Sequence, residues 1–445
     1  MKINLKWMLL SAVLIATISC EEKEPAIDLQ VATQPVSSVT AFSAKSGGAV
    51  TGTEPISERG ICWGTSQEPT TDDARISDID AVEGEYALKM LPLQPATTYY
   101  VRAYVKTVAG KTVYGSAVTF KSSDLAARNE SNSYMALPEE AVVIPVSRAN
   151  KSSLGTQIGA SDALSVELIW MDNMDVIDTV FVHGAGADGK VVVMAGNVEG
   201  NAVVAVKVNN QIKWSWHIWI TQSAKNMGTV TMPSGSILMD RNLGATSKTI
   251  SEIGAVGVQF QFGRKDPFTA SASFGTPSEL LLFDLKGANP AITAVAGPKD
   301  LAYVTANPLV FVKSKWVDWC NEDIRNWWVN DGGTKTVYDP CPEGWRVPSI
   351  DAYAGITDAH FDKTVQGGHN FTYNGQSNFF AYTGYREVEG AMDATANYGT
   401  MWVNSAIPGA AGTGAALSPS FGVGGTAAIN GAPRARALSI RCIKE

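Results

Sequence analysis

The sequence is poor in charge. Only 18% of its 445 residues are Asp, Glu, Lys or Arg, below the quarter that is usual in globular domains. Glycine is frequent, with 41 residues. Few charges and many glycines favour β-rich, loop-rich domains over long solvated helices. The formal net charge is −8, and no basic stripe is present, which argues against nucleic-acid binding and against electrostatic docking on anionic lipid.

Recognisable catalytic and metal-binding strings are also missing. The sequence has four histidines, and none falls in a catalytic string with Cys320 or Cys341. Acidic residues form no interpretable catalytic pair, and neither the phosphate-binding G-x-x-x-x-G-K-[ST] string nor the zinc-binding H-E-x-x-H string occurs. Asp318 and Asp323 would bind calcium only if loops supplied further oxygens. We therefore predict a non-enzyme without catalytic residues, metal site or cofactor.

The longest apolar run lies at the N-terminus. Lys2 and Lys6 form a positive segment before the run from Trp7 to Ile18, which is too short to span a bilayer. This pattern is typical of a secretory signal peptide. The run ends in small residues directly before Cys20, and this ending resembles the lipobox of bacterial lipoproteins. The resemblance implies cleavage after residue 19 and lipid on Cys20, with an ordinary signal peptide and a chance cysteine as the alternative.

An acidic cluster follows the cysteine. Residues 21–24 read Glu-Glu-Lys-Glu, and the cluster resembles the signal that moves some lipoproteins of Gram-negative anaerobes to the outer leaflet. The alternative is that residues 20–28 are only a solvated tether. The resemblance implies lipid anchoring in the outer membrane, exposed at the cell surface. Removal of residues 1–19 takes away two lysines, so the charge of the mature chain changes from −8 to −10.

Residues 29–122 carry the pattern of a first β-sandwich. Residues 99–106 alternate with period two, and residues 109–111 supply a turn. The spacing L-x-P-x-T-x-Y-x-V-x-A, which begins at Leu93, resembles fibronectin type III domains, in which the tyrosine caps a corner of the sandwich. The string from Arg59 to Gly64 resembles the third strand of this fold in bacterial surface proteins. The resemblance implies a spacer or binding module, with Cys62 packed as a small apolar side chain.

Residues 130–222 predict a second β-rich module. Strand-like runs alternate with turn signals at 187–189 and 199–201. The runs are 141–146, 164–170, 176–182, 191–195, 202–208 and 214–220. The last one places Trp214 and Trp216 on one face and His217 on the other. A core strand with a half-exposed back face is one interpretation, and an aromatic platform for stacking sugars is the other.

Residues 224–445 contain three unusual strings. They begin at Met239 (M-D-R-N-L-G-A), Phe260 (F-Q-F-G-R-K-D-P-F) and Asp339 (D-P-C-P-E-G-W-R-V-P-S), and the chain closes on Ser-Ile-Arg-Cys at Cys442. Together they resemble the FISUMP-type major paralogous domain of bacterial lipoproteins. The resemblance implies a mixed α/β (α+β), C-type-lectin-like fold with long loops and neighbouring termini. The predicted fold class is therefore multidomain: two all-β Ig- or fibronectin-like sandwiches, followed by this domain.

The same segment predicts two helices and a long loop. Apolar residues between Trp316 and Trp328 recur at helical spacing, and we interpret them as one face of a helix packed on the core. Ser349 is a candidate N-cap of a second helix. Residues 404–433 carry no charge and are rich in Gly and Ala, which predicts a long loop.

The lectin-like resemblance also implies a disulfide between Cys341 and Cys442, because meeting termini bring the two cysteines together. Exported chains enter an oxidising compartment, where such bonds persist. Cys320, on the apolar stripe, then remains a buried thiol. Two alternatives stay open: a bond between Cys320 and Cys341, and no bond at all.

These features predict a lipid-anchored surface binding or adhesion protein. Two sandwiches act as spacers, and the C-terminal domain binds a glycan, a host protein or a fimbrial subunit through residues that the sequence does not identify. One alternative is a fimbrial or surface-assembly subunit. The other is an enzyme with a fold related to the formylglycine-generating oxygenases.

Overall fold

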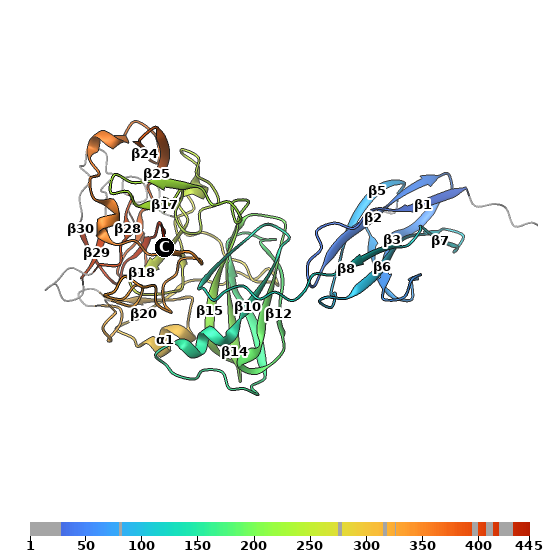
Figure 1. The fold of residues 1–445 in the computed structure, drawn as a ribbon, viewed down its shortest axis with the longest axis horizontal. Helices are drawn as coiled ribbons and strands as arrows, with labels where there is room; N and C mark the ends of the chain where they lie inside the picture. Colours follow the sequence, from blue (N-terminus) through green and yellow to red (C-terminus); the bar gives the residue numbers. More distant parts are fainter. Residues whose placement is uncertain are drawn as a thin grey trace, which may run out of the picture. The chain divides into compact units, whose positions relative to one another are not determined.

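The computed structural model describes residues 28–79, 82–274, 278–314, 318–324, 326–393, 399–405, 413–417 and 430–445. Their regular secondary structure is mostly β-strand (Figure 1). They form two compact units, one within residues 28–122 and one that contains residues 123–445. Cys20 and the acidic cluster 21–24 lie outside the described residues. Within the described part of the chain, no helix has the length and hydropathy needed to cross a membrane.

The first unit is a β-sandwich. One sheet has the order β1-β2-β5, and the other has the order β4-β3-β6-β7 with β8 also paired to β6. The strands are β1 (Leu29–Thr33), β2 (Ala44–Gly52), β3 (Ile56–Gly64), β4 (Ala74–Asp78), β5 (Gly84–Met90), β6 (Thr98–Thr107), β7 (Thr112–Tyr114) and β8 (Val118–Lys121). The predicted alternation of residues 99–106 is confirmed in β6, where Val101, Ala103 and Val105 are buried in the core. Cys62 is a buried free thiol.

The second unit begins with another pair of sheets. Their orders are β10-β13-β12 and β11-β14-β15-β9. The strands are β9 (Ser133–Ala136), β10 (Ala141–Pro145), β11 (Leu164–Met171), β12 (Ile177–His183), β13 (Lys190–Ala195), β14 (Gly200–Val208) and β15 (Gln211–Ile220). All six predicted runs in residues 130–222 are therefore strands. The turn predicted at 199–201 is displaced, because Gly200 and Asn201 already pair with β15.

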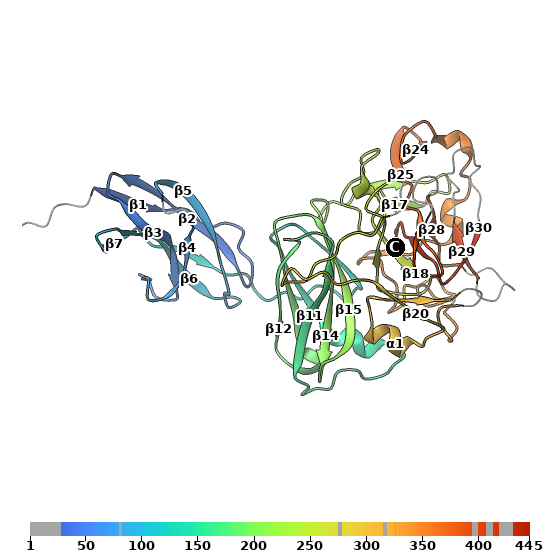
Figure 2. The same ribbon diagram turned by 180° about the vertical axis from the view of Figure 1, so that it is seen from behind.

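Strand β15 is covered on both faces. Trp214, Trp216 and Trp219 are each 0% exposed, and Ser215 and His217 are 1% exposed. The predicted half-exposed back face is therefore wrong, because the C-terminal part of the chain packs against it. One large hydrophobic cluster contains β14 and β15 residues together with residues from the last two hundred positions, among them Phe262 and Trp402. This shared cluster joins the second sandwich and the C-terminal part into one compact unit (Figure 2).

The C-terminal part consists of short strands. Its sheets have the orders β16-β17-β32-β22, β19-β18-β31-β28-β29-β30 with β26 and β27 at its side, β20-β21 and β23-β24-β25. The strands are β16 (Thr229–Thr231), β17 (Ile237–Met239), β18 (Val258–Gln261), β19 (Phe268–Thr269), β20 (Thr293–Ala296), β21 (Val310–Lys313), β22 (Trp345–Arg346), β23 (Phe361–Asp362), β24 (Gly368–Tyr373), β25 (Gln376–Ala381), β26 (Tyr385–Arg386), β27 (Met392–Asp393), β28 (Met401–Trp402), β29 (Thr413–Leu417), β30 (Asn430–Pro433), β31 (Ala437–Ser439) and β32 (Ile443–Lys444). Because β32 pairs with β17, the end of the chain lies beside the start of this part (Figure 1).

Helices are short throughout the described residues. The α-helix α1 spans Leu301–Ala306, and Asp300 caps it by accepting a hydrogen bond from the Tyr303 N–H. The 3-10 helices are Val146–Lys151, Gly186–Asp188, Ile253–Ala255, Ile350–Tyr353 and Asp358–His360. Ser349 stands at the N-cap of the fourth of these, but its side chain makes no capping hydrogen bond. The predicted second helix is therefore reduced to one 3-10 turn.

The helix predicted between residues 316 and 328 is wrong. Its described residues, 318–324 and 326–328, form bends and turns rather than a helix. The apolar residues are buried as expected, but tertiary hydrogen bonds hold them. The indole N–H of Trp319 donates to the Phe262 carbonyl at 2.7 Å, and that of Trp328 donates to the Arg264 carbonyl at 3.0 Å. Tertiary packing thus overrides the local helical pattern.

The long loop predicted over residues 404–433 is also wrong in part. Within it, β29 pairs with β28 and with β30, so this uncharged segment extends a sheet. Small residues lacking strong strand propensity are held there by backbone pairing to a strand that the core already fixes.

Candidate functional site

The structure joins two of the cysteines that the sequence singled out. Cys341 and Cys442 form a disulfide with their Cα atoms 6.0 Å apart, and Cys320 is a buried free thiol. This is the pair that the lectin-like resemblance implies. Cys442 immediately precedes β32, which pairs with β22 close to Cys341. The bond therefore ties the last strand to the start of the C-P-E-G-W-R string.

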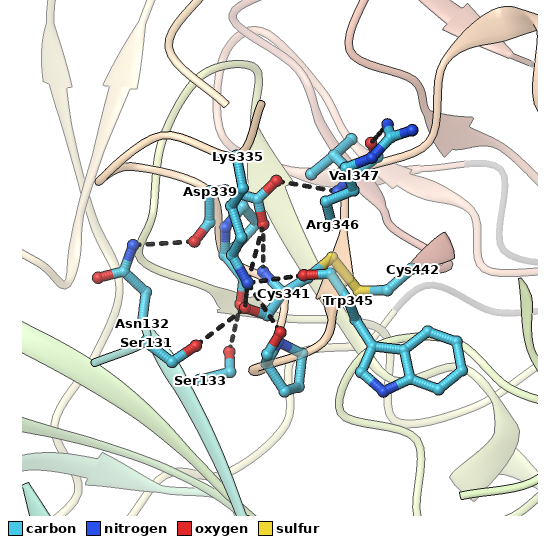
Figure 3. Close-up of a disulfide and its surroundings, with 12 residues drawn as sticks. Ser131, Asn132, Ser133, Lys335, Asp339, Cys341, Trp345, Arg346, Val347 and Cys442 are labelled. Atoms are coloured by element: carbon cyan, nitrogen blue, oxygen red, sulfur yellow. Dashed lines mark hydrogen bonds and ion pairs between the residues drawn. A yellow bond between two sulfur atoms is a disulfide. The ribbon is translucent and has the colours of Figure 1, made fainter. Parts of the chain in front are cut away.

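The loop that follows Cys341 is held by one half-buried lysine and one buried aspartate (Figure 3). Lys335 Nζ donates to the carbonyls of Cys341, Pro342 and Trp345 at 2.6, 2.7 and 2.6 Å. Asp339 accepts from the backbone N–H groups of Cys341 and Val347 at 2.8 and 2.9 Å. Burial raises the pKa of Asp339 to about 6, opposed by the nearby Lys335. These bonds satisfy the loop's backbone and leave it little freedom.

Residues at the start of β9 complete this arrangement from the sandwich side (Figure 3). The Ser131 hydroxyl donates to the Cys341 carbonyl at 3.0 Å, and the Ser133 hydroxyl donates to the Pro340 carbonyl at 2.6 Å. The Asn132 amide donates to the Asp339 carbonyl at 2.9 Å. The C-P-E-G-W-R string is thus the place where the sandwich and the C-terminal part are fastened together.

Charged residues of the other unusual strings are also structural. Arg264 is 2% exposed and donates to the carbonyls of Val310, Asn307 and Pro308. Arg441 is 1% exposed, and its guanidinium carbon lies 3.8 Å from the centre of the Phe380 ring. Lys265 and Asp266 pair inside the core at 2.7 Å. These charged side chains therefore build the interior of the segment.

The predicted aromatic platform for sugars is wrong. Trp214 and Trp216 are fully buried within β15, so neither indole can stack on a ligand. The nearby Asp318 pairs with Arg434 at 2.6 Å. Across the described residues, no group of three or more His, Cys, Asp or Glu is placed to hold a metal ion.

A cavity of about 280 Å³ lies where the sandwich meets the C-terminal part. It is open to solvent and small for a ligand site, the size of one sugar or amino-acid residue. Four chain segments, two from the sandwich and two from the C-terminal part, line it. The described lining residues are Asp172, Asn173, Glu199, Gly200, Asn201, Gly244, Thr246, Ile253, Gly254, Val256, Gly257, Val258, Thr269, Ala270, Ser271, Ala272 and Leu280. We refer to it as the 172–269 pocket.

Asp172 is the central polar group of the 172–269 pocket. It directly follows β11, and it accepts from the backbone N–H and from the side-chain amide of Asn201, both at 2.7 Å. A Cβ atom at position 200 would lie 2.5 Å from an Asp172 carboxylate oxygen and 2.5 Å from a Val176 methyl carbon, so these side chains would have to shift to admit it. Burial raises the pKa of Asp172 to about 6, and the hydrogen bonds from Asn201 oppose that rise. No cation contributes, so the carboxylate lacks a counter-ion among the described residues.

Thr269 supplies an unused hydroxyl. Its residue partner across the sheet is Val258, which also lines the pocket, so the two side chains lie on the same face. Thr269 is 2% exposed, and within the described part of the chain its Oγ1 has no hydrogen-bond partner. Because the oxygen itself is buried, a ligand in the open space of the pocket does not reach it.

A chain of buried polar groups runs from the pocket to the disulfide loop. The Asn201 amide nitrogen donates to Asp172 and to the Gly244 carbonyl. This orientation places the amide oxygen of Asn201 3.0 Å from His217 Nε2. His217 Nε2 therefore carries a proton, and Nδ1 lies 2.9 Å from the Ser133 hydroxyl. Burial lowers the pKa of His217 to about 3 and keeps it neutral. The Ser133 hydrogen thus has two acceptors in reach, His217 Nδ1 and the Pro340 carbonyl.

The sequence did not reveal this pocket. Asp172, Asn201 and Thr269 come from three segments, with 97 positions between the first residue and the last, and no spacing rule links them. The one available signal was the string Glu199-Gly200-Asn201, which we interpreted as a turn.

Comparisons with known proteins find similarity of fold only. No protein-family model matches the chain, and no curated protein matches it. Among solved structures, the chain is similar to the sensor domain of the anti-sigma factor RsgI4 of Pseudobacteroides cellulosolvens (23% identity over 22% of this chain and 98% of that one, TM-score 0.18). It is also similar to the sixth fibronectin type III domain of human fibronectin type III domain containing protein 3 (18% identity, 24% and 96% covered, TM-score 0.19) and to fibronectin(III)-like modules of Clostridium thermocellum CbhA (12% identity, 43% and 94% covered, TM-score 0.17).

Proposed function

We propose that this chain is a lipid-anchored binding protein of the outer membrane surface, and that it binds its ligand in the 172–269 pocket. The lipid is carried by Cys20, and the sandwich of residues 29–122 acts as a spacer. The unit of residues 123–445 is the binding part. The protein needs no catalytic residue, metal or cofactor for this role.

The observation that carries the proposal is the pocket itself. It combines a carboxylate that has no counter-ion among the described residues with an open space of about 280 Å³. A carboxylate without a counter-ion is costly in a folded protein, and a ligand group that pairs with it offsets part of that cost. The position of the pocket at the junction of two structural parts is typical of binding sites.

We further propose that residues 224–445 are a FISUMP-type, C-type-lectin-like domain that has fused its core with the preceding sandwich. Two observations support this assignment: the pairing of β17 with β32, which brings the ends of the domain together, and the disulfide that fixes its last strand. The binding site then lies at the junction and not in the loops of the domain.

Binding is tested with the purified full chain on an array of glycans, host matrix proteins and small metabolites. Ala272 lines the pocket and is half-buried, so Ala272→Trp fills the space. Ala288 is exposed and lies outside the pocket, so Ala288→Trp is the matched control. We expect Ala272→Trp to abolish binding of a ligand that wild type and Ala288→Trp retain. Binding that survives Ala272→Trp, or a wild type that binds nothing, contradicts the proposal.

A further inference from the structure

Three backbone carbonyls of the loop that follows Cys341 converge on one position. The carbonyl oxygens of Cys341, Pro342 and Trp345 lie 2.6, 2.7 and 2.6 Å from Lys335 Nζ (Figure 3). The negative ends of three converging carbonyl dipoles repel one another unless a positive charge lies between them. The loop is therefore built around a cation. We refer to these three carbonyls as the 341–345 site.

The ammonium group of Lys335 occupies the 341–345 site. An ammonium group has three N–H donors, and the site offers one carbonyl oxygen for each of them. The three distances are at the short end of the range for charge-assisted hydrogen bonds. The carboxylates of Asp339 and Glu445 each lie 3.9 Å from Nζ, beyond hydrogen-bond distance but close enough to favour a positive charge.

The chemistry of the 341–345 site is also that of a site for a free monovalent ion. Backbone carbonyls that converge in this way replace the hydration shell of K⁺ in ion channels, and oxygen ligands suit hard cations in general. The groups in contact with the cation are neutral, and the position holds a single positive charge. Ca²⁺ takes six to eight oxygens, usually with carboxylates in direct contact, whereas both carboxylates here stand 3.9 Å away.

The 341–345 site is accessible from solvent. Lys335 and Glu445 line a cavity of about 380 Å³ that is open to solvent, and the side chain of Lys335 is 16% exposed. A small ion therefore has a route to the three carbonyls once the lysine side chain is shortened.

We infer that the loop of residues 341–345 is a binding site for a monovalent cation, and that Lys335 supplies this cation as a covalently attached ammonium group. The wild-type loop therefore keeps its conformation without a metal ion from solution. Shortening Lys335 to alanine turns the loop into a site for free K⁺ or ammonium. The inference does not depend on the 172–269 pocket or on the function proposed for it.

Urea unfolding of the full chain carrying Lys335→Ala tests the inference. The variant is compared in potassium chloride, ammonium chloride and choline chloride at one ionic strength, because choline is too large to fit between the three carbonyls. In choline, we expect the variant to unfold at a lower urea concentration than wild type. Potassium or ammonium should restore about half or more of this loss and raise the midpoint further with concentration, as for any ion that binds only the folded state. Wild type should unfold at the same midpoint in all three salts.

Two matched variants separate the 341–345 site from general effects of salt. Lys335→Met keeps a long side chain in the site but carries no charge, so its loss of stability should not be recovered by potassium. Lys265 is a second buried lysine, 5% exposed, whose ammonium group contacts only one carbonyl, together with a hydroxyl and a carboxylate. Lys265→Ala should therefore show no difference between potassium and choline.

Crystals of Lys335→Ala soaked in rubidium chloride locate the ion directly. We expect an anomalous peak between the carbonyls of Cys341, Pro342 and Trp345. Equal unfolding midpoints in potassium and choline, or the lack of such a peak, would overturn the inference. A variant as stable as wild type in choline would show that the loop needs no cation. Failure to fold in every salt would show that a free ion does not replace the ammonium group, and rescue by Ca²⁺ alone would overturn the monovalent assignment.

Discussion

Single buried charges hold the sandwich and the C-terminal part together. Lys265 Nζ donates to the Ser215 carbonyl at 3.0 Å and to the Ser215 hydroxyl at 2.6 Å, and it lies 4.4 Å from the centre of the Trp214 ring. Its partner Asp266 accepts from the Ser215 hydroxyl at 2.6 Å. Burial lowers the pKa of Lys265 to about 8, while Asp266 opposes that shift. The lysine remains protonated at neutral pH because of this partner.

Lys265→Met is expected to destabilise the protein by about 3 kcal/mol or more, because it leaves the Asp266 carboxylate buried without a cation. Urea unfolding monitored by tryptophan fluorescence measures this loss of stability. The signal reports on the second unit, because all described tryptophans except Trp63 lie in residues 123–445. Adding Asp266→Asn removes the stranded charge and recovers part of the loss. A loss below about 0.5 kcal/mol, as at an ordinary surface site, would show that water reaches this pair.

His217 makes stability depend on pH. Burial lowers its pKa from 6.5 to about 3, so the folded protein keeps His217 neutral where the unfolded chain protonates it. Stability from this group is therefore present above pH 6.5 and is lost as the pH falls toward 3. The loss is roughly 1.4 kcal/mol per pH unit within that window.

Urea unfolding at several pH values compares wild type with His217→Gln. The glutamine amide, like the neutral imidazole, both donates and accepts a hydrogen bond, but it does not titrate. We expect the variant to lose less stability than wild type below pH 6.5. His360, which lies nearer the surface, serves as the control through His360→Gln. Equal acid sensitivity of wild type and His217→Gln would mean that His217 is already protonated in the folded protein.

At the scale of elements, strands followed their sequence patterns more closely than helices did. In β6 the alternation of residues also marks the buried face, whereas β13, β14 and β15 are buried on both faces along most of their length. The helical spacing between residues 316 and 328 predicted the burial of its described residues but not their conformation, because the indoles of Trp319 and Trp328 donate to the carbonyls of Phe262 and Arg264.

The disulfide is the covalent link between elements. Mass spectrometry of the unreduced protein should yield a peptide pair joined through Cys341 and Cys442, with Cys62 and Cys320 as free thiols. Replacing both paired cysteines with serine should destabilise residues 123–445 by about 4–5 kcal/mol in the chain-entropy model, since the bond closes a loop of 101 positions. A linked peptide of Cys320 and Cys341 would contradict the pairing.

At the scale of the whole molecule, anchoring rests on Cys20. Cys20→Ala should leave a protein that no longer partitions into detergent and no longer takes up labelled palmitate, because the lipidated thiol is gone. Cys62→Ala is the matched control, since that thiol is buried in the first sandwich. Equal palmitate labelling of wild type and Cys20→Ala would refute the lipoprotein assignment.

Surface exposure should depend on the acidic cluster. Replacing residues 21–24 with alanine is expected to protect the protein from protease added to intact cells, whereas wild type is cleaved. Lipid labelling should be equal in both proteins, which separates export to the surface from anchoring. Protection of the wild type itself would place the protein in the periplasm and exclude an adhesion role.

The sequence alone determined the β-rich character of the chain and the six strands of residues 130–222. The lectin-like resemblance implied the Cys341–Cys442 pair but left two alternatives open, and the structure joins these two cysteines. Each of these predictions follows from local residue alternation or from a specific residue string. Only the tertiary structure decided that β15 is covered on both faces, that the charged strings are interior, and that a pocket forms around Asp172. Those features arise where segments far apart in sequence meet, and burial at such a junction depends on what packs there and not on the local pattern.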